Sequence, residues 1–331
     1  MKCPLCDTSD YQLQAQDYQG YVENTAFDIF LCNNCLTSFV DPSVIDPSIY
    51  DQIYSENGDG GYQRYYDYAK NIKQESNPLQ FLAKEETTYL PLLEYLNKQA
   101  SKLDILEVGC GYGYTVYAVS KLGHNILGID ISKSAVDFAT KEFGPLYKTL
   151  DVKDLLDTQK YDLIYANEVI EHLPDTQGFM KSLKRLLKPG GVIHLTTPNK
   201  DYATKINPSA IWITILPPHH MLWGSTKGLS DIAKLHGFDV EFFDFGKSYG
   251  KNENRLNEIR RLNNENKPTP MVVGGNPVEI QLPTHKKLIA KLLYMPIVQQ
   301  LTTNYLIQVQ GFKDYKTNAV FLRLADTKSS A

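Results

Sequence analysis

The sequence predicts an α/β protein built on a parallel, doubly wound sheet with helices on both faces. From residue 103 onward, short apolar runs that are typical of buried strands alternate with segments of helical periodicity. The first of these runs ends in three closely spaced glycines, a pattern that is typical of a strand turning sharply into a helix. Ahead of this region, residues 1–40 hold two C-x-x-C pairs, which indicate a small separate module.

Composition and charge narrow the possible function classes. The chain has 331 residues, of which 42% are hydrophobic, and this is enough for one large domain with small additions. The formal net charge is −4, whereas a chain that neutralises nucleic-acid phosphates is usually basic, so a small or neutral substrate is favoured over nucleic acid. No run approaches the roughly 18 apolar residues that span a membrane. We therefore expect a cytoplasmic protein without a membrane span.

The segment between the cysteine module and the sheet divides into two parts. Residues 41–77 begin with a run rich in Asp, Pro, Ser and Gly, which predicts a linker, and continue with clustered tyrosines beside Arg64. These tyrosines either cover a bound ligand or pack between domains. Apolar residues at roughly helical spacing predict a helix over 78–100, broken near Pro91. The clustered tyrosines are Tyr62, Tyr65, Tyr66 and Tyr68.

Strands and helices then alternate through a domain expected at 78–331. Strands are expected at 103–108, 125–130, 147–150, 161–166, 191–197, 239–245 and 319–324. Helices are expected at 114–122, 134–143, 176–187 and 226–236. Residues 246–317 are polar and broken by Pro and Gly, so we expect an insertion that serves as a lid or a dimer contact. In a sheet of this kind, ligands bind beyond the carboxyl ends of the strands.

The glycine loop after the first strand distinguishes between two cofactor classes. A dinucleotide fingerprint, G-x-G-x-x-G, would place its third glycine at position 114, which is Tyr114. The loop is instead G-x-G-x-G, with glycines at 109, 111 and 113 and an acidic residue before them. This spacing disfavours a nicotinamide-dependent oxidoreductase.

Two acidic residues follow the next two strands. Asp130 ends the second strand, where a carboxylate can accept hydrogen bonds from both hydroxyls of a ribose. Each such charge-assisted bond contributes on the order of 1.5–3 kcal/mol. Asp151 follows the third strand and is placed to hold an adenine amino group. The alternative is that both carboxylates cap helices or turns.

These motifs together resemble those of class I S-adenosylmethionine (SAM)-dependent methyltransferases. The resemblance covers roughly residues 80–245 and implies a Rossmann-like, seven-stranded sheet whose last strand is antiparallel, with SAM as the cofactor. The motifs that carry it are Glu107–Gly113, Asp130 and the Lys-Pro-Gly-Gly run at 188–191. Three further motifs, at 167–173, 197–199 and 218–220, are similar to those of the ubiquinone-biosynthesis O-methyltransferases.

The resemblance also implies which residues surround the cofactor. It implies that the three glycines surround the methionine part, that Asp130 binds ribose, that Asp151 lies by adenine, and that residues 167–168 close the other side. The full set expected to contact SAM is Glu107, Gly109, Gly111, Gly113, Asp130, Ile131, Asp151, Val152, Asn167 and Glu168.

Methyl transfer is an in-line displacement, so the protein chiefly aligns donor and acceptor. A hydroxyl or activated carbon acceptor must also lose a proton, and histidine suits that role at neutral pH. His172 follows the fourth strand, and His219 and His220 follow the fifth, so all three are expected at the same edge of the sheet. His220 best fits the Pro-x-His pattern of the related family. Glu171 is expected to orient a histidine or bind substrate; a structural hydrogen bond or cap is the alternative for each histidine.

The two C-x-x-C pairs provide the second group of expected ligands. Four thiolates suit tetrahedral Zn²⁺, and a closed four-cysteine site is structural rather than catalytic. The alternatives are free thiols or a redox pair. The expected ligands are Cys3, Cys6, Cys32 and Cys35. The module and the tyrosine-rich linker resemble those of sugar C-methyltransferases, which implies a sugar, a surface-polysaccharide precursor or a natural-product precursor as substrate.

The favoured function is therefore methyl transfer to a small molecule with a histidine as general base, in a chain that forms a monomer or a homodimer. Two alternatives remain open. One is an RNA methyltransferase that grips RNA with the zinc module, and the other is a non-catalytic scaffold with the SAM-binding fold.

Overall fold

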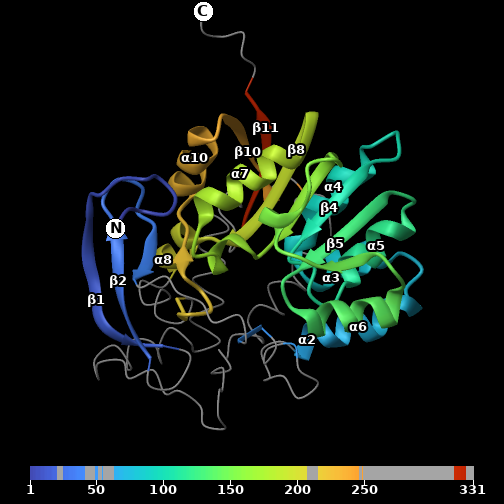
Figure 1. Cartoon of the computed structure of the whole chain (residues 1–331), viewed down its shortest axis with the longest axis horizontal. Helices are drawn as coiled ribbons and strands as arrows, with labels where there is room; N and C mark the ends of the chain where they lie inside the picture. Colours follow the sequence, from blue (N-terminus) through green and yellow to red (C-terminus); the bar gives the residue numbers. More distant parts are fainter. Residues whose placement is uncertain are drawn as a thin grey trace, which may run out of the picture.

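The computed structural model describes residues 1–20, 25–41, 49–50, 54, 63–206, 215–245, 248 and 317–325. A seven-stranded sheet forms the centre of this part of the chain (Figure 1). Its strand order is β10-β11-β8-β7-β4-β5-β6. The strands span β4 Asp104–Val108, β5 Asn125–Asp130, β6 Tyr147–Thr149, β7 Tyr161–Asn167, β8 Leu187–Pro198, β10 Phe238–Phe242 and β11 Thr317–Leu324.

The sheet is parallel except at its last strand. Strands β4, β5, β6, β7 and β8 pair in parallel, and β11 lies antiparallel between β8 and β10. This confirms the α/β fold class and the antiparallel last strand that the sequence implied. The strand order changes direction at β4, which brings the carboxyl ends of β4, β5 and β7 together at one edge.

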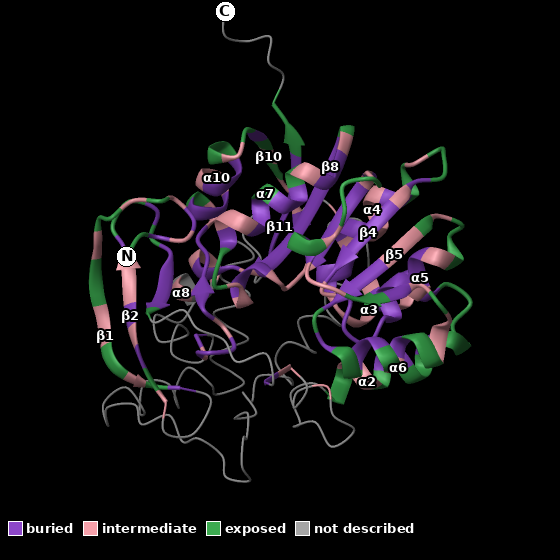
Figure 2. Ribbon diagram, in the orientation of Figure 1, coloured by how far each residue is buried: buried purple, intermediate pink, exposed green. Residues whose placement is uncertain are grey.

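Alternate residues of the strands face two different helix layers. Leu106 and Ile164 belong to a core shared with α7 Thr176–Leu186 and α10 Thr226–Leu235. Ile105 and Leu163 belong to a core on the opposite face, which a second set of helices completes. That set comprises α2 Gln63–Asn71, α3 Pro78–Glu85, α4 Leu90–Asn97 and α5 Tyr114–Lys121. The buried colouring of the strands and the exposed outer sides of α2 and α6 Lys133–Phe143 show this layering (Figure 2).

The N-terminal cysteine module joins the larger domain through a shared sheet. Its strands β1 Tyr11–Gln19, β2 Ala26–Cys32 and β3 Ser38–Asp41 form an antiparallel meander. Strand β9 Leu222–Trp223, from a distant part of the sequence, pairs with β3 as its fourth strand. Cys3 and Cys35 lie in the same core as helices α7 and α10. The module therefore contacts the larger domain through β9, in the segment that follows β8.

Several boundaries differ from those expected. The helix expected over 78–100 breaks at Glu86, whose backbone is extended, and the 3-10 helix η2 Thr87–Tyr89 precedes α4. Pro91 lies in the first turn of α4, where backbone N–H groups make no hydrogen bond within the helix, so proline does not interrupt it. Strand β8 begins at Leu187, so the Lys-Pro-Gly-Gly run lies within the strand instead of ending a helix.

Only parts of the 41–77 and 246–317 segments are among the described residues. Helix α2 occupies the tyrosine-rich half of the expected linker. The expected insertion at 246–317 lies outside the described residues except for residues 248 and 317. Among the described residues, no helix is long and apolar enough to cross a membrane.

Candidate active site

A cavity of about 850 Å³ lies at the carboxyl ends of β4, β5 and β7. This volume is in the range of pockets that bind small molecules and cofactors. The sequence-predicted residues that line it are Glu107, Gly109, Gly111, Asp130, Ile131, Asp151, Val152, Asn167, Glu168, Glu171, His172, His219 and His220. The structure thus brings together nearly every residue that the sequence nominated, from both the cofactor and the catalytic sets.

Glycines at the first two loop positions are required by the backbone and by close neighbours. Gly109 has a φ of +74°, and a Cβ there would lie 2.6 Å from a methyl of Val169. Gly111 has a φ of +46°, and its Cβ would lie 3.0 Å from the hydroxyl of Tyr54. Both φ values lie in the left-handed region that side chains disfavour. The loop therefore presents bare backbone to the cavity.

Gly113 differs from the other two because it is not part of the cavity lining. Its φ is +78°, and a Cβ would meet Ala139 and the ring of Tyr147 at 2.6 Å. The Tyr147 hydroxyl also donates a 2.7 Å hydrogen bond to the Gly113 carbonyl. In this structure, the third glycine serves the turn into α5 and the packing against α6.

Asp130 holds the glycine loop in place. Its Oδ2 accepts a hydrogen bond from the Gly111 amide at 2.8 Å, and its Oδ1 accepts one from the Ser132 amide at 2.9 Å. Burial raises the pKa of this carboxyl, and hydrogen bonds from the backbone of Ser132, Gly111 and Ile131 oppose that rise. Each carboxylate oxygen offers about two lone pairs, so each can still accept one bond from a ligand. This arrangement fits a ribose with two adjacent hydroxyls.

Glu107 presents an unsatisfied carboxylate oxygen to the same cavity. The side chain is only 3% exposed, and its Oε2 has no hydrogen-bond partner among the described residues. Burial and the charge of Asp130 raise the pKa of Glu107 well above its ordinary value. A buried acceptor without a partner is unfavourable, so a ligand donor at this position would be stabilising. A ligand that crosses the bare glycine loop with a hydrogen-bond donor would satisfy this oxygen.

Asp151 and Asn167 both already serve a local structural role. Asp151 caps the 3-10 helix η3 Val152–Asp154 by accepting from the Lys153 amide at 3.0 Å. Asn167 Oδ1 accepts from the hydroxyls of Thr88 and Thr196 at 2.8 and 2.7 Å. The capping alternative for Asp151 is thus realised, and both residues also line the cavity.

Three histidines meet on one wall of the cavity, far apart in sequence but close in space. His172 belongs to the 3-10 helix η4 Ile170–His172 after β7, and its ring centre lies 4.3 Å from that of His219 and 4.8 Å from that of His220. The Nδ1 atom of His172 is 2.8 Å from the His219 carbonyl oxygen. Burial and His220 lower the pKa of His172 to about 3. The pKa of His219 is also lowered well below its usual value, chiefly by burial.

Glu171 lies behind the histidines and is 1% exposed. Its Oε2 accepts a 3.0 Å hydrogen bond from the Thr197 hydroxyl, whereas its Oε1 lies 4.0 Å from His172 Nε2 and has no hydrogen-bond partner in the described part of the chain. Burial and the charge of Glu168 raise the pKa of Glu171 well above its ordinary value.

An aromatic wall completes the cavity, and sequence reasoning found only part of it. Arg64 and Tyr65 line the cavity, and Arg64 forms a 3.0 Å ion pair with Glu86. Tyr50 was not singled out, yet its ring lies 6.5 Å from that of His172. Nothing in the local sequence around Tyr50 distinguishes it from the other tyrosines. The further lining tyrosines are Tyr54, Tyr89, Tyr112 and Tyr114. Tyr62 lies outside the described residues, whereas Tyr66 and Tyr68 pack against neighbouring aromatic rings.

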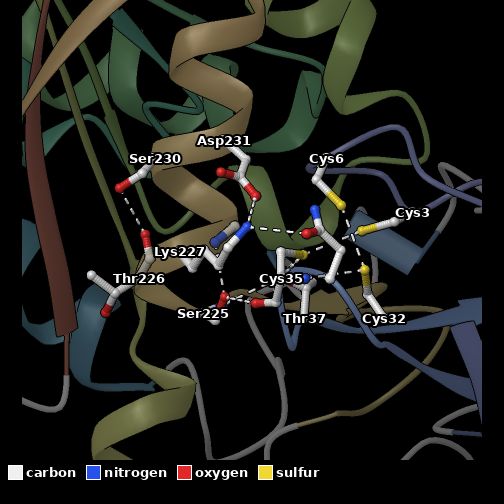
Figure 3. A network of polar contacts seen from close by, with 12 residues as sticks. Cys3, Cys6, Cys32, Cys35, Thr37, Ser225, Thr226, Lys227, Ser230 and Asp231 are labelled. Atoms are coloured by element: carbon white, nitrogen blue, oxygen red, sulfur yellow. Dashed lines mark hydrogen bonds and ion pairs between the residues drawn. The ribbon is translucent and has the colours of Figure 1, made fainter. Parts of the chain in front are cut away.

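The four cysteines of the N-terminal module form a second cluster. The sulfur atoms of Cys3 and Cys35, and those of Cys6 and Cys32, lie 3.5 Å apart (Figure 3). Four sulfurs bound to one zinc at about 2.3 Å lie roughly 3.7–3.8 Å apart, so this spacing fits a tetrahedral ion. The hydroxyl of Ser225, the residue that caps α10, donates to the Cys35 carbonyl oxygen.

A buried lysine reinforces this junction. Lys200 is 7% exposed and its Nζ donates to the carbonyl oxygen of Leu36, beside the cluster. Burial lowers the pKa of Lys200 to about 8. The cation lies close to cysteines whose thiolates would carry negative charge on a metal. Cys110, the fifth cysteine, lies within the glycine loop, is buried near Val116 and Val136, and is not part of this cluster.

Comparisons with known proteins agree with this geometry. Residues 79–241 match the methyltransferase domain family. A ubiquinone biosynthesis O-methyltransferase of Actinobacillus pleuropneumoniae is 29% identical over 194 residues, which cover 52% of this chain and 80% of that protein. One of Coxiella burnetii is 31% identical over 151 residues, which cover 43% of this chain and 62% of that protein.

Two solved structures are also similar. A SAM-dependent methyltransferase from Archaeoglobus fulgidus is 16% identical, with a TM-score of 0.44 and coverage of 72% of this chain and 93% of that one. A magnesium protoporphyrin IX methyltransferase from Synechocystis with bound SAM is 16% identical, with a TM-score of 0.42 and coverage of 61% and 91%.

The sheet topology, the glycine loop with Asp130 and the family match define a class I SAM-dependent methyltransferase. Within that class, the match to the methyltransferase domain family extends from α3 through most of β10.

Proposed function

We propose that this methyltransferase transfers the methyl group of SAM to a small-molecule acceptor bound in front of the histidines. One observation supports this most directly: a single cavity has the glycine loop and Asp130 on one side and His172, His219 and His220 on the other. A donor held by the first group and an acceptor held by the second would lie within the same enclosed space, as an in-line displacement requires.

The chain's own residues would hold the cofactor as follows. Asp130 would accept hydrogen bonds from the ribose hydroxyls while keeping Gly111 in position. The orphaned Oε2 of Glu107 would accept from a donor at the amino-acid end. When bound, SAM supplies a methyl group activated by its sulfonium charge. The remaining expected contacts, from Ile131, Asp151, Val152, Asn167 and Glu168, would close around the rest of the molecule.

The histidine cluster is the proposed place where the acceptor loses its proton. Of the three imidazoles, His220 is the best placed to act as general base, because this residue is only half-buried. His172 is a weak base, since burial lowers its pKa to about 3. Glu171 would orient His172 from behind, 4.0 Å from its Nε2.

The acceptor atom that we propose is a hydroxyl oxygen. The relatives named above are O-methyltransferases, which supports oxygen over nitrogen or carbon. The rings of Tyr50, Tyr54 and Tyr65 in the cavity wall suit the flat or apolar face of a ring, as found in sugars and in aromatic natural-product precursors. Structural Zn²⁺ on the four-cysteine cluster is also part of this proposal.

Calorimetric titration with S-adenosylhomocysteine (SAH), with a nicotinamide dinucleotide as the comparison ligand, tests the cofactor. We expect SAH to bind and the dinucleotide to give no heat. A screen of hydroxylated sugars and phenols with isotope-labelled SAM then tests the acceptor class. His220→Ala should lose turnover and keep SAH binding, whereas His236→Ala, on the far end of α10, should keep both. Failure of SAH to bind would overturn the proposal.

Two alternatives have their own readouts. Binding to bulk RNA that weakens steeply with salt would favour the RNA methyltransferase. A full acceptor screen without turnover in a chain that binds SAH would favour the scaffold. A homodimer and a cytoplasmic location remain predictions, which sedimentation and cell fractionation test.

A further inference from the structure

We infer that His172, His219 and His220 together bind a divalent transition-metal ion on the acceptor side of the cavity, separate from the four-cysteine cluster. One ligand atom from each ring lies within 4.8 Å of the other two. The three ring centres are 4.3, 4.7 and 4.8 Å apart. The inference rests on the proposed function and refines it: the bound ion, in place of His220 acting alone as a base, would promote loss of the acceptor's proton.

The first supporting contact determines the protonation of His172. Its Nδ1 lies 2.8 Å from the His219 carbonyl oxygen, and a carbonyl oxygen only accepts, so Nδ1 carries the proton. The lone pair is therefore on Nε2, the atom on the Glu171 side. Histidines that bind metals almost always donate their other ring N–H to a carbonyl or carboxylate in this way.

The second supporting observation comes from Glu171. Its Oε1 is buried without a hydrogen-bond partner in the described ranges and lies 4.0 Å from His172 Nε2, which is too far for a hydrogen bond. Two atoms that bind one zinc at about 2.0–2.2 Å lie up to roughly 4 Å apart. An ion between them would satisfy the orphaned oxygen, whose burial without a partner is unfavourable.

The spacing of the rings needs only a small adjustment. Nitrogens bound to one tetrahedral zinc lie about 3.3–3.5 Å apart, so the widest pair must approach by roughly 1–1.5 Å. His220 is half-buried and can rotate by this amount more easily than the buried His219. Imidazole ligands suit Zn²⁺, Fe²⁺, Co²⁺ and Ni²⁺ rather than Mg²⁺ or Ca²⁺.

Three nitrogens and the Glu171 oxygen would fill four positions, and catalytic zinc can expand to a fifth, which would face the cavity that all four residues line. An acceptor hydroxyl bound at that position would ionise more readily, with its proton released to solvent. The acceptor oxygen would then use a lone pair to form the new C–O bond. As the methyl carbon leaves SAM, the C–S bond breaks and its electron pair remains on sulfur, giving a neutral thioether.

Metal counting on the full chain tests the inference. The protein is loaded with Zn²⁺, passed through a desalting column containing a micromolar chelator, and measured by mass spectrometry. We expect about two ions for the wild type and about one for His172→Ala and for His220→Ala. His236→Ala is the matched control and should keep about two. His220→Ala is the decisive variant because its half-buried ring can be removed with least disturbance of the fold.

Loading with Co²⁺ identifies which site is lost. The four-cysteine site should give intense sulfur-to-cobalt absorption that persists in the histidine variants, while the weaker visible bands of a histidine site should disappear. About one ion in the wild type, or equal metal content in wild type and His220→Ala, would overturn the inference. SAH titration of the same samples separates the two proposals. If the wild type does not bind SAH, the methyltransferase proposal is refuted. If His220→Ala holds as many metal ions as the wild type, only the histidine metal site is refuted.

Discussion

Replacing Asp130 with alanine should strongly weaken SAH binding. The carboxylate accepts from the Gly111 and Ser132 amides and retains one acceptor position on each oxygen for the two ribose hydroxyls. Two lost charge-assisted bonds at about 1.5–3 kcal/mol each amount to about 3–6 kcal/mol. This corresponds to a dissociation constant that is larger by on the order of 10²–10⁴-fold.

Isothermal titration of SAH into wild type, Asp130→Ala and Asp137→Ala measures this effect. Asp137 is the matched control because it is an exposed carboxylate on α6 whose partner is Lys133, one turn away. We expect Asp137→Ala to bind like the wild type. Circular dichroism at the titration temperature must show that Asp130→Ala is folded. An affinity for SAH within about threefold of the wild type in folded Asp130→Ala would refute the ribose assignment.

Three further predictions concern the carboxylate in the loop, the cysteine cluster and the core. Burial raises the pKa of Glu107, so its stabilising contribution to folding is complete below the unfolded-state pKa and is lost as pH rises through the folded-state pKa. Between about pH 5 and pH 8, the melting temperature of Glu107→Gln should therefore rise relative to that of the ligand-free wild type. A difference in melting temperature that stays constant over this range would contradict the prediction. Cys32→Ser should lose one zinc ion and lower the melting temperature, because metal binding and folding of the module are coupled, while Cys110→Ala, outside the cluster, should keep its zinc. Leu183→Ala, a fully buried change on α7, should lower the free energy of unfolding by about 2–5 kcal/mol in urea titrations, and a loss below 1 kcal/mol would show that the core is not packed as described.

The elements of the sheet were predictable because their signals are local. The run at 125–130 is apolar, short and bounded, and it forms β5 with those bounds. Gly109 and Gly111 reflect a backbone requirement at their own positions, since both have positive φ. Glu86 shows the limit of such signals. Its extended backbone interrupts the helix expected over 78–100, although Glu86 is neither a glycine nor a proline.

The candidate site was predictable in its members but not in their contacts. His172 and His219 are 47 residues apart, and only the common edge of β7 and β8 brings the ring of one to the carbonyl of the other. The role of Gly113 also depended on distant neighbours, Ala139 and Tyr147, which fill the space that a side chain would need. Tyr50 lines the cavity, but no motif in the sequence around it predicts this position.

The sequence by itself determined the alternation of strands and helices, the glycine loop, the acid at the end of β5 and the pairing of the cysteines into two C-x-x-C motifs. Only the tertiary structure decided that β9 completes the sheet of the cysteine module, and that three histidines and Glu171 share one wall. The physical reason is the sequence distance over which each kind of interaction acts. Apolar periodicity and glycine requirements act over a few residues, whereas contacts between side chains distant in sequence exist only once the whole core has packed.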